Sequence, residues 1–199
     1  AVSNLTTNLM EQSRFDEAIG LIAENLEQMR GKPELETEVL RSKGNLAAAY
    51  LELGRYAEAA PILAETLEAK RAELGERDPS TLTSMHNLAG LYFALGKIED
   101  SESMYRAAFE GRAEALGEVD PKTISSMTAW TWALTDLGRF EEAEALLNRA
   151  LAITRKRLGP GHPAYLHALS SLGNTLNKSG NLDRAEQVFA ELVAIQEEH

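Results

Sequence analysis

The sequence contains no cysteine, which excludes disulfide bridges, thiolate metal sites and a cysteine nucleophile. Proline is limited to six residues, and aromatic residues make up only 6% of the chain. β-Sheets are usually richer in aromatic and branched side chains, whereas the alanine and leucine that dominate here favour closely packed helices. We therefore expect an all-α fold.

Long apolar runs and basic clusters are also missing. No stretch approaches the ~18 apolar residues of a membrane span, and residues 1–10 have neither the basic segment nor the apolar core of a signal peptide. With 31 acidic and 20 basic side chains, the net charge of −11 opposes nonspecific binding to nucleic acid or anionic lipid. We expect a soluble, cytoplasmic protein that binds another protein, and neither nucleic acid nor a membrane. Because the chain begins at Ala1 and not at a methionine, we also expect it to be a fragment of a larger protein.

A repeat of 42 residues organises the chain. When the repeats are aligned, residues 42 positions apart form columns of equivalent residues. These columns include Pro79, Pro121 and Pro163; Gly75, Gly117 and Gly159; Gly54, Gly96, Gly138 and Gly180; and the apolar set Leu46, Leu88, Trp130 and Leu172. A shift of 41 residues adds a first copy that contains Leu5 and Leu9. The sequence therefore predicts one repeat domain over residues 1–199, with repeats at about 1–34, 35–76, 77–118, 119–160 and 161–199.

Each repeat is predicted to be a pair of helices. Asp78 precedes Pro79, which places a capping carboxylate before a proline that needs no N–H at the first helical position. That helix is expected over residues 79–95, and the second over residues 98–116, because Gly96 and Gly117 permit the left-handed turns that end helices. A small residue recurs where the two helices should cross, at Ala59, Ser101, Ala143 and Ala185.

The order of Leu88-Ala89, Tyr92, Gly96 and Ser101 resembles the tetratricopeptide repeat signature. That family usually has a period of ~34 residues, so eight extra residues, or roughly two helical turns, lengthen the hairpin here. This long form, with its connector at 158–163, resembles the kinesin light chain subclass, and residues 79–92 and 121–127 resemble the bacterial relatives of that subclass. The resemblance is close over about 35–199 and looser over 1–34, where the first junction is shortened.

The resemblance implies a right-handed α-solenoid of five helical hairpins that serves as a protein-interaction scaffold. In the bacterial relatives such arrays often accompany kinase, nucleotidase or protease-like signalling domains. HEAT and armadillo repeats also have periods near 42. They do not require a glycine-terminated first helix followed five residues later by a small residue in each copy, so the tetratricopeptide interpretation is preferred.

Residues for catalysis are not evident. The sequence has no HExxH pair, no GxxxxGK[ST] loop and no GxGxxG segment. His162 replaces the capping Asp78 and Asp120, and His86 and His167 fall in different columns without an obvious carboxylate partner. We predict no catalytic residue, no metal site and no cofactor; enzymatic activity would require an attached catalytic domain.

The first helices of stacked hairpins line a concave groove, which offers a binding surface. The residues expected to line it lie off the core face of those helices: Arg41, Asn45, His86, Asn87, Phe93, Thr128, Trp132, His167, Ser171 and Asn174. Most are neutral and polar, which suits hydrogen bonds to a peptide backbone. Because Arg41 is nearly the only basic residue among them, a clamp for a terminal carboxylate is not expected.

Two tryptophans in one helix allow a sharper prediction. Residues two apart on a helix point ~200° from each other, so Trp130 and Trp132 cannot share one environment. We expect Trp130 in the core and Trp132 in the groove as an anchor for a partner. The alternative is that Trp132 fills a gap left by Thr131 or covers Phe93.

The last helix keeps more apolar residues than one supporting face uses, namely Val188, Phe189, Leu192, Val193 and Ile195. A following helix, another domain or a second copy of the chain would cover them. Binding of an extended or helical segment in the groove is the leading prediction. The alternative is a structural or regulatory module of a larger signalling protein that stacks end to end or self-associates through its terminal helices.

Overall fold

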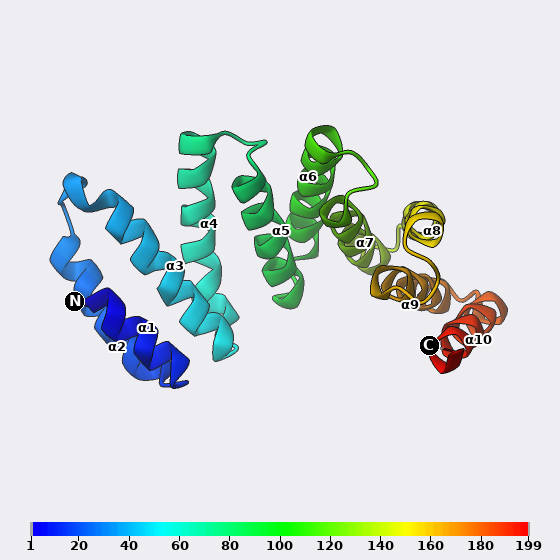
Figure 1. Ribbon diagram of the computed structural model, residues 1–199, viewed down its shortest axis with the longest axis horizontal. Helices are drawn as coiled ribbons and strands as arrows, with labels where there is room; N and C mark the ends of the chain where they lie inside the picture. Colours follow the sequence, from blue (N-terminus) through cyan, green and yellow to red (C-terminus); the bar gives the residue numbers. More distant parts are fainter. Residues whose placement is uncertain (1, 199) are drawn as a thin grey trace. The chain divides into compact units, whose positions relative to one another are not determined.

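The computed structural model describes residues 2–198, with the side chains of residues 5–32 and 34–198. Within this range every regular element is a helix (Figure 1). In chain order the elements are α1 (Val2–Glu11), α2 (Phe15–Met29), the 3-10 helix η1 (Pro33–Leu35), α3 (Glu36–Glu52), α4 (Tyr56–Leu74), α5 (Pro79–Ala94), α6 (Ile98–Leu116), α7 (Pro121–Asp136), α8 (Phe140–Arg157), α9 (Pro163–Lys178) and α10 (Leu182–Glu198). The predicted all-α fold of helical hairpins is confirmed.

The helices form two compact units, Ala1–Glu76 and Arg77–His199. The division falls between the second and third predicted repeats. Unit 1 therefore contains the hairpins α1–α2 and α3–α4, and unit 2 contains α5–α6, α7–α8 and α9–α10.

The first helices of unit 2 begin at capped prolines, as the sequence predicts. Asp78 Oδ1 accepts from the amide of Ser80 at 2.7 Å, and Asp120 Oδ1 accepts from that of Lys122 at 2.8 Å. His162 takes the same role with its ring, because its Nδ1 accepts from the amide of Ala164 at 3.1 Å. His162 thus caps α9, although its side chain is an imidazole and not a carboxylate.

Glycines with positive φ end these helices. At the turn between α5 and α6, Gly96 has φ +72° and the amide of Lys97 donates back to the carbonyl of Tyr92 at 2.9 Å. This left-handed turn satisfies a carbonyl in the last turn of α5 with a hydrogen bond and lets α6 begin two residues later.

Small side chains allow the two helices of each hairpin to pack closely. Ala59, Ser101 and Ala143 are fully buried, and Ala185 is 4% exposed. Ser101, the polar member of this column, donates its hydroxyl to the carbonyl of Ala89 in the partner helix at 2.8 Å. The predicted crossing point is confirmed.

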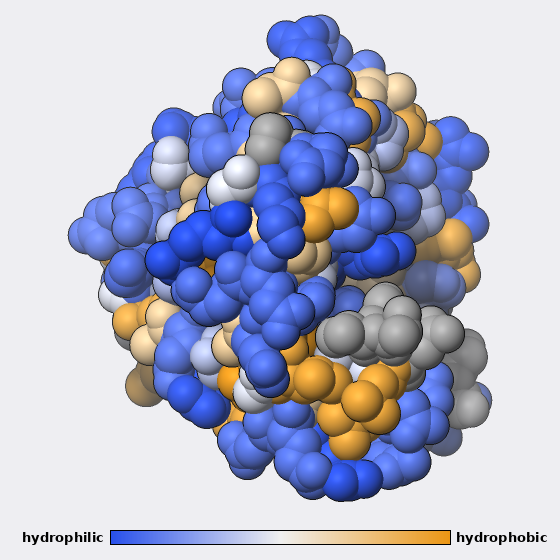
Figure 2. Space-filling model, turned by 90° about the vertical axis from the view of Figure 1, so that its left-hand side faces the viewer, coloured by the Kyte–Doolittle hydropathy of each residue, from blue (hydrophilic) through white to orange (hydrophobic). Residues whose placement is uncertain are grey.

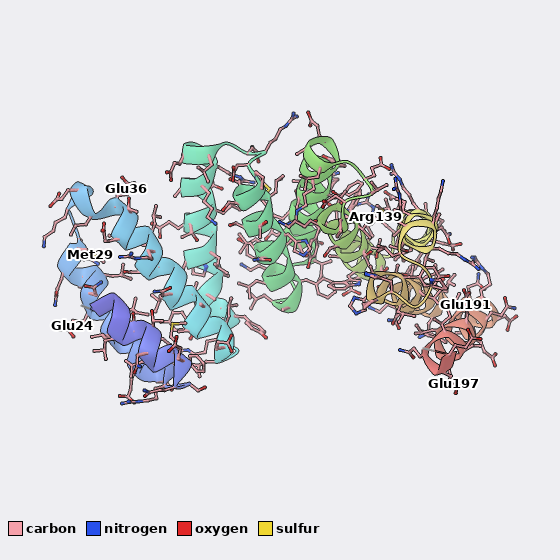
Figure 3. The ribbon with its side chains drawn as sticks, viewed as in Figure 1. Glu24, Met29, Glu36, Arg139, Glu191 and Glu197 are labelled. Carbon is pink, nitrogen blue, oxygen red and sulfur yellow. The ribbon has the colours of Figure 1, made fainter. Side chains whose placement is uncertain are left out.

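Unit 1 departs from the repeat at its first junction. Helix α2 has 15 residues, whereas α4 and α6 have 19 each, so α2 stops about a turn early. The space beyond its end is a hollow of about 570 Å³ between α2 and α3, lined in part by Leu26, Met29 and Val39. Met29 and Glu36 mark its two sides in Figure 3. Figure 2 shows the face of the molecule on this side, where apolar patches interrupt a mostly hydrophilic surface.

In unit 2 the first helices lie next to one another. Helix α7 contacts both α5 and α9, while the second helices α6, α8 and α10 contact one another less. A row of helices that is more closely spaced lies on the inner side of a curved stack, so α5, α7 and α9 line the concave side of unit 2.

Candidate functional site

Trp132 is the central side chain on the concave side of unit 2. It is 45% exposed although its indole is held in place from both neighbouring first helices. Its Nε1 donates to Ser171 Oγ of α9 at 3.1 Å. Its ring lies beside that of Phe93 of α5, with centroids 6.3 Å apart and planes inclined by 51°. The indole is therefore fixed in position with much of its surface open to a partner.

Trp130 lies on the other side of α7, as the helical geometry predicts. Its ring stacks on Phe109 of α6 at 5.8 Å, and its Nε1 donates to Glu102 Oε1 at 3.0 Å. Arg139 Nη1 donates to the same carboxylate oxygen at 3.2 Å, so the buried Glu102 has a cationic partner. Trp130 thus joins hairpins and is half-buried against the core, whereas Trp132 faces the groove.

Two hollows flank the indole of Trp132. The amide hollow, of about 240 Å³, is lined by Phe93, Trp132, Thr135, Asp136, Ser171, Asn174, Thr175, Asn177 and Lys178. The histidine hollow, of about 150 Å³, is lined by His86, Pro121, Ile124, Ser125, Thr128, Ala129, Trp132, Ala164 and His167. Trp132 belongs to both and forms the wall between them.

The amide hollow is polar but nearly neutral. Asn174 and Asn177 expose amides on α9, and Lys178 pairs with Asp136 across the gap between α9 and α7. Because Lys178 and Asp136 pair with each other and the hydroxyls of the hollow are buried and hydrogen-bonded, its exposed uncharged polar groups are the amides of Asn174 and Asn177.

The histidine hollow is bounded by an imidazole that stays neutral. His86 Nδ1 lies 3.2 Å from Ser126 Oγ, and its ring meets Tyr105 edge to face at 5.3 Å. Burial, reinforced by the nearby positive charge of Arg112, lowers the pKa of His86 to about 4. Burial also raises the pKa of Tyr105 to about 12, so its hydroxyl is protonated at neutral pH.

Arg112 acts on His86, which lines this hollow, and is 5% exposed. Its guanidinium links three helices, because Nη1 donates to Ser126 Oγ of α7 at 2.6 Å and Nη2 donates to Thr83 Oγ1 of α5 at 3.3 Å. The carbonyl of Lys122 accepts a further hydrogen bond from Nη1 at 3.1 Å. Within residues 2–198 no carboxylate forms an ion pair with it, although Asp120 is close enough to favour its charge. Sequence reasoning missed Arg112; the signal was a basic residue four positions after Ala108, on the buried stripe of α6.

The structure brings most of the predicted groove residues of unit 2 together. Phe93, Trp132, Ser171 and Asn174 line the amide hollow, and His86, Thr128 and His167 line the histidine hollow.

The remaining predicted residues are not among those that line the two hollows. Asn87 is exposed on α5 and lines neither hollow. Arg41 and Asn45 lie on α3, in unit 1. Thr128 and Ser171 are only 7% and 8% exposed, so within their hollows they contribute shape and hydrogen bonds more than surface.

The ion pair of Asp136 and Lys178 is a further feature that the predicted set omitted. The two residues are 42 positions apart and thus occupy the same repeat column. An acidic and a basic residue at equivalent positions of neighbouring repeats were the available signal. Their pairing depends on the offset between neighbouring hairpins, which the sequence pattern alone does not measure.

Within the described part of the chain, no three histidine, aspartate or glutamate side chains gather as a metal site would require. Among the same residues, every helix is too short or too polar to span a bilayer.

A family model decides the identity of the repeats. The model for the tetratricopeptide repeat matches residues 38–114, 80–153 and 127–198. The chain belongs to the tetratricopeptide repeat family. A search among curated proteins gave no significant match.

Solved structures of other tetratricopeptide repeat proteins share the fold. A kinesin light chain-type protein of Podosopora anserina with nearly identical TPR-like repeats is 24% identical, with a TM-score of 0.83 over 98% of this chain and 92% of the other. BtubC (BKLC) from P. vanneervenii is 22% identical, with a TM-score of 0.77 over 98% of this chain and 78% of the other. MamA from Desulfovibrio magneticus is 13% identical, with a TM-score of 0.70 over 100% and 94%. The predicted α-solenoid of kinesin light chain-like hairpins is confirmed.

Proposed function

We propose that this tetratricopeptide repeat chain is a scaffold that binds a segment of a partner protein across the two hollows on either side of Trp132. Tetratricopeptide repeats generally serve protein–protein interaction. The observation that carries the proposal is the state of Trp132 itself, which is held by Ser171 and Phe93 and is still 45% exposed. A rigid, partly exposed indole in a concave surface is the usual form of an interface hot spot.

The size of the hollows favours a peptide over a small-molecule ligand. At about 240 and 150 Å³ they are smaller than the ~300–1,000 Å³ of typical ligand pockets. Two small hollows separated by one ring suit two side chains of an extended or helical segment. The neutral amides of Asn174 and Asn177 supply donors and acceptors for the backbone of that segment.

Scaffolds of this family are typically non-enzymatic. We propose that the chain acts by binding alone, in the cytoplasm, with no cofactor and with no nucleic acid or membrane partner. We also propose that residues 1–199 form one repeat domain of a larger protein. Fractionation of the source cells, and the length of the complete reading frame, test the location and the larger protein.

A comparative pull-down tests groove binding. Protein carrying Trp132→Ala with Asn174→Ala is compared with wild type and with Leu158→Ala, a control whose apolar side chain is 41% exposed outside both hollows. The binding segment of a retained protein is then mapped by overlapping peptides. We expect the groove variant to weaken binding of that peptide by at least ~30-fold, from the ~2 kcal/mol of a hot spot, and the control to leave it unchanged. Equal affinity for wild type and groove variant would refute the proposal.

The terminal helices favour a second candidate, end-to-end self-association. The contact of Trp130 with Phe109 has a counterpart one repeat later in Leu172 and Leu151, which pack in the same core. The next equivalents at the chain's ends are Leu5 and Val193, and these are 51% and 52% exposed. Val193 is thus equivalent to Phe109, and Leu5 is equivalent to Trp130, but each lacks the contact that its equivalent makes inside the chain. Val193 on α10 of one copy could make that contact with Leu5 on α1 of a second copy, in a head-to-tail stack.

Charge on α10 supports the same contact. Glu102 and Glu144 have arginine partners in the following hairpin, Arg139 and Arg184. Their equivalent on α10, Glu186, forms no ion pair within residues 2–198 and lines an apolar hollow that Glu197 also borders (Figure 3). Sedimentation velocity over a 100-fold concentration range tests this candidate. We expect assembly that grows with concentration and is lost in Val193→Asp; a monomer throughout would exclude it.

A further inference from the structure

We propose that Arg112 and Ser126 lock His86 in one neutral tautomer with its proton on Nε2, so that the histidine hollow presents a fixed hydrogen-bond donor and takes an acceptor oxygen of the bound segment. The ligand part rests on the proposed function. The tautomer lock is a property of the free protein.

The direction of the hydrogen bonds follows from Arg112. A guanidinium can only donate, so Ser126 Oγ accepts from Arg112 Nη1 at 2.6 Å. The serine hydroxyl retains one proton, and the other polar atom within its reach among the described residues is His86 Nδ1 at 3.2 Å. If Ser126 Oγ also accepted from Nδ1, its own proton would have no acceptor among the described residues, so we infer that the hydroxyl donates to Nδ1 and that Nδ1 is the unprotonated nitrogen of the ring.

The charge of the surroundings keeps the imidazole from taking a second proton. Arg112 and Tyr105 face the ring from α6, His167 borders the same hollow from α9, and Asp120 acts on Arg112 from the start of α7. The positive charge of Arg112 acts on the ring, and like charges disfavour protonation. Burial acts in the same direction, so the imidazole is neutral at pH 7.

A neutral imidazole with an unprotonated Nδ1 carries its proton on Nε2. This nitrogen makes no hydrogen bond within the described residues and is not among the buried side-chain nitrogens that lack a partner, so it is open to solvent. Since His86 lines the histidine hollow, the donor is available to a ligand there. Its complement is an acceptor oxygen, either a peptide carbonyl or a carboxylate, which the buried positive charge of Arg112 also attracts.

Nuclear magnetic resonance of histidine labelled with ¹⁵N tests the lock without any partner. We expect the wild-type His86 ring to show the Nε2–H pattern and no titration between pH 5.5 and 7.5. In Ser126→Ala the Nδ1 loses its donor while Arg112 keeps its charge, so both tautomers should appear and the pKa should stay low. In Arg112→Met the pKa should rise but stay below the ordinary value of ~6.5, because burial still lowers it. A wild-type ring protonated on Nδ1, or one that titrates near 6.5, would overturn the lock.

Small probes test the acceptor preference. N-methylacetamide represents a peptide carbonyl, acetate represents a carboxylate, and methylammonium, which offers donors alone, is the control at equal ionic strength. We expect the His86 Nε2–H signal to shift with at least one acceptor probe and not with methylammonium. A response to methylammonium, or none to either acceptor, would overturn the ligand assignment. If the Trp132 variant bound the partner as well as wild type, the proposed groove binding would fail while the His86 signals stayed as expected. Failure of the proposed function can therefore be told apart from failure of the His86 proposal.

Discussion

Gly173 of α9 lies against the ring of Phe189 in α10, so closely that a β-carbon at position 173 would come 2.6 Å from the ring's Cε1. Both residues are part of the last hairpin, and Phe189 packs on the core cluster of unit 2. The missing side chain of Gly173 is therefore what lets α10 carry a phenylalanine at this point.

Gly173→Ala should destabilise unit 2, because the added methyl would displace a ring that is packed on the core. We expect a loss of about 1–3 kcal/mol from overpacking, partly offset by the ~1 kcal/mol by which alanine favours a helix. Chemical denaturation followed by circular dichroism measures the change. Gly20→Ala in α2 is the matched control, since a β-carbon added at position 20 would have nothing within 4 Å. It should raise stability by up to ~1 kcal/mol. Equal effects at both sites would contradict the contact.

Ala143→Leu tests the helix crossing of the second hairpin in unit 2. Ala143 is fully buried between α7 and α8, so a larger side chain has no space and should cost ~1–3 kcal/mol. Ala145→Leu, two residues further along the same helix and exposed, should change the melting temperature little. An unchanged melting temperature in Ala143→Leu would show that the crossing is not close-packed.

Asp78→Ala removes the cap of α5. Its carboxylate accepts from the amide of Ser80 at 2.7 Å, and loss of such a cap typically costs ~1 kcal/mol. Asp78→Asn keeps an acceptor oxygen and should retain most of the stability. If the two variants were equally unstable in denaturant titrations, the charge of Asp78 and not its cap would be the stabilising feature.

His86 should make the stability of unit 2 sensitive to acid. Burial holds the pKa of the folded ring at about 4, whereas the unfolded ring has the ordinary ~6.5, so the unfolded state binds more protons between these values. The contribution of neutral His86 is complete above pH 6.5 and is lost as the pH falls toward 4. Melting temperatures measured from pH 7 to 4.5 should therefore fall more for wild type than for His86→Gln.

Carboxylates with lowered pKa, such as Glu142 beside Arg139, are present in both proteins and cancel in that comparison. Parallel profiles for wild type and His86→Gln would mean that folding does not lower the pKa of His86.

Much of the fold follows from the sequence because helix ends are decided locally. Asp78 with Pro79, and Gly96 with its positive φ, act within a single turn of chain, so the limits of α5 and α6 were predictable to within a residue. The opposite placement of Trp130 and Trp132 followed in the same way from helical geometry. A fixed period then repeats these local rules along the chain, which determined the hairpin stack.

The tertiary structure decided what the hairpins present to a partner. Trp132 meets Ser171 from 39 residues away, and His86 meets Ser126 from 40. Such contacts depend on the offset between neighbouring hairpins, which side-chain packing sets and which a sequence period does not reveal. The same packing buried Thr128 and Ser171 more deeply than their column suggested. It also brought Arg112 close enough to act on His86 through its charge and through its hydrogen bond to Ser126.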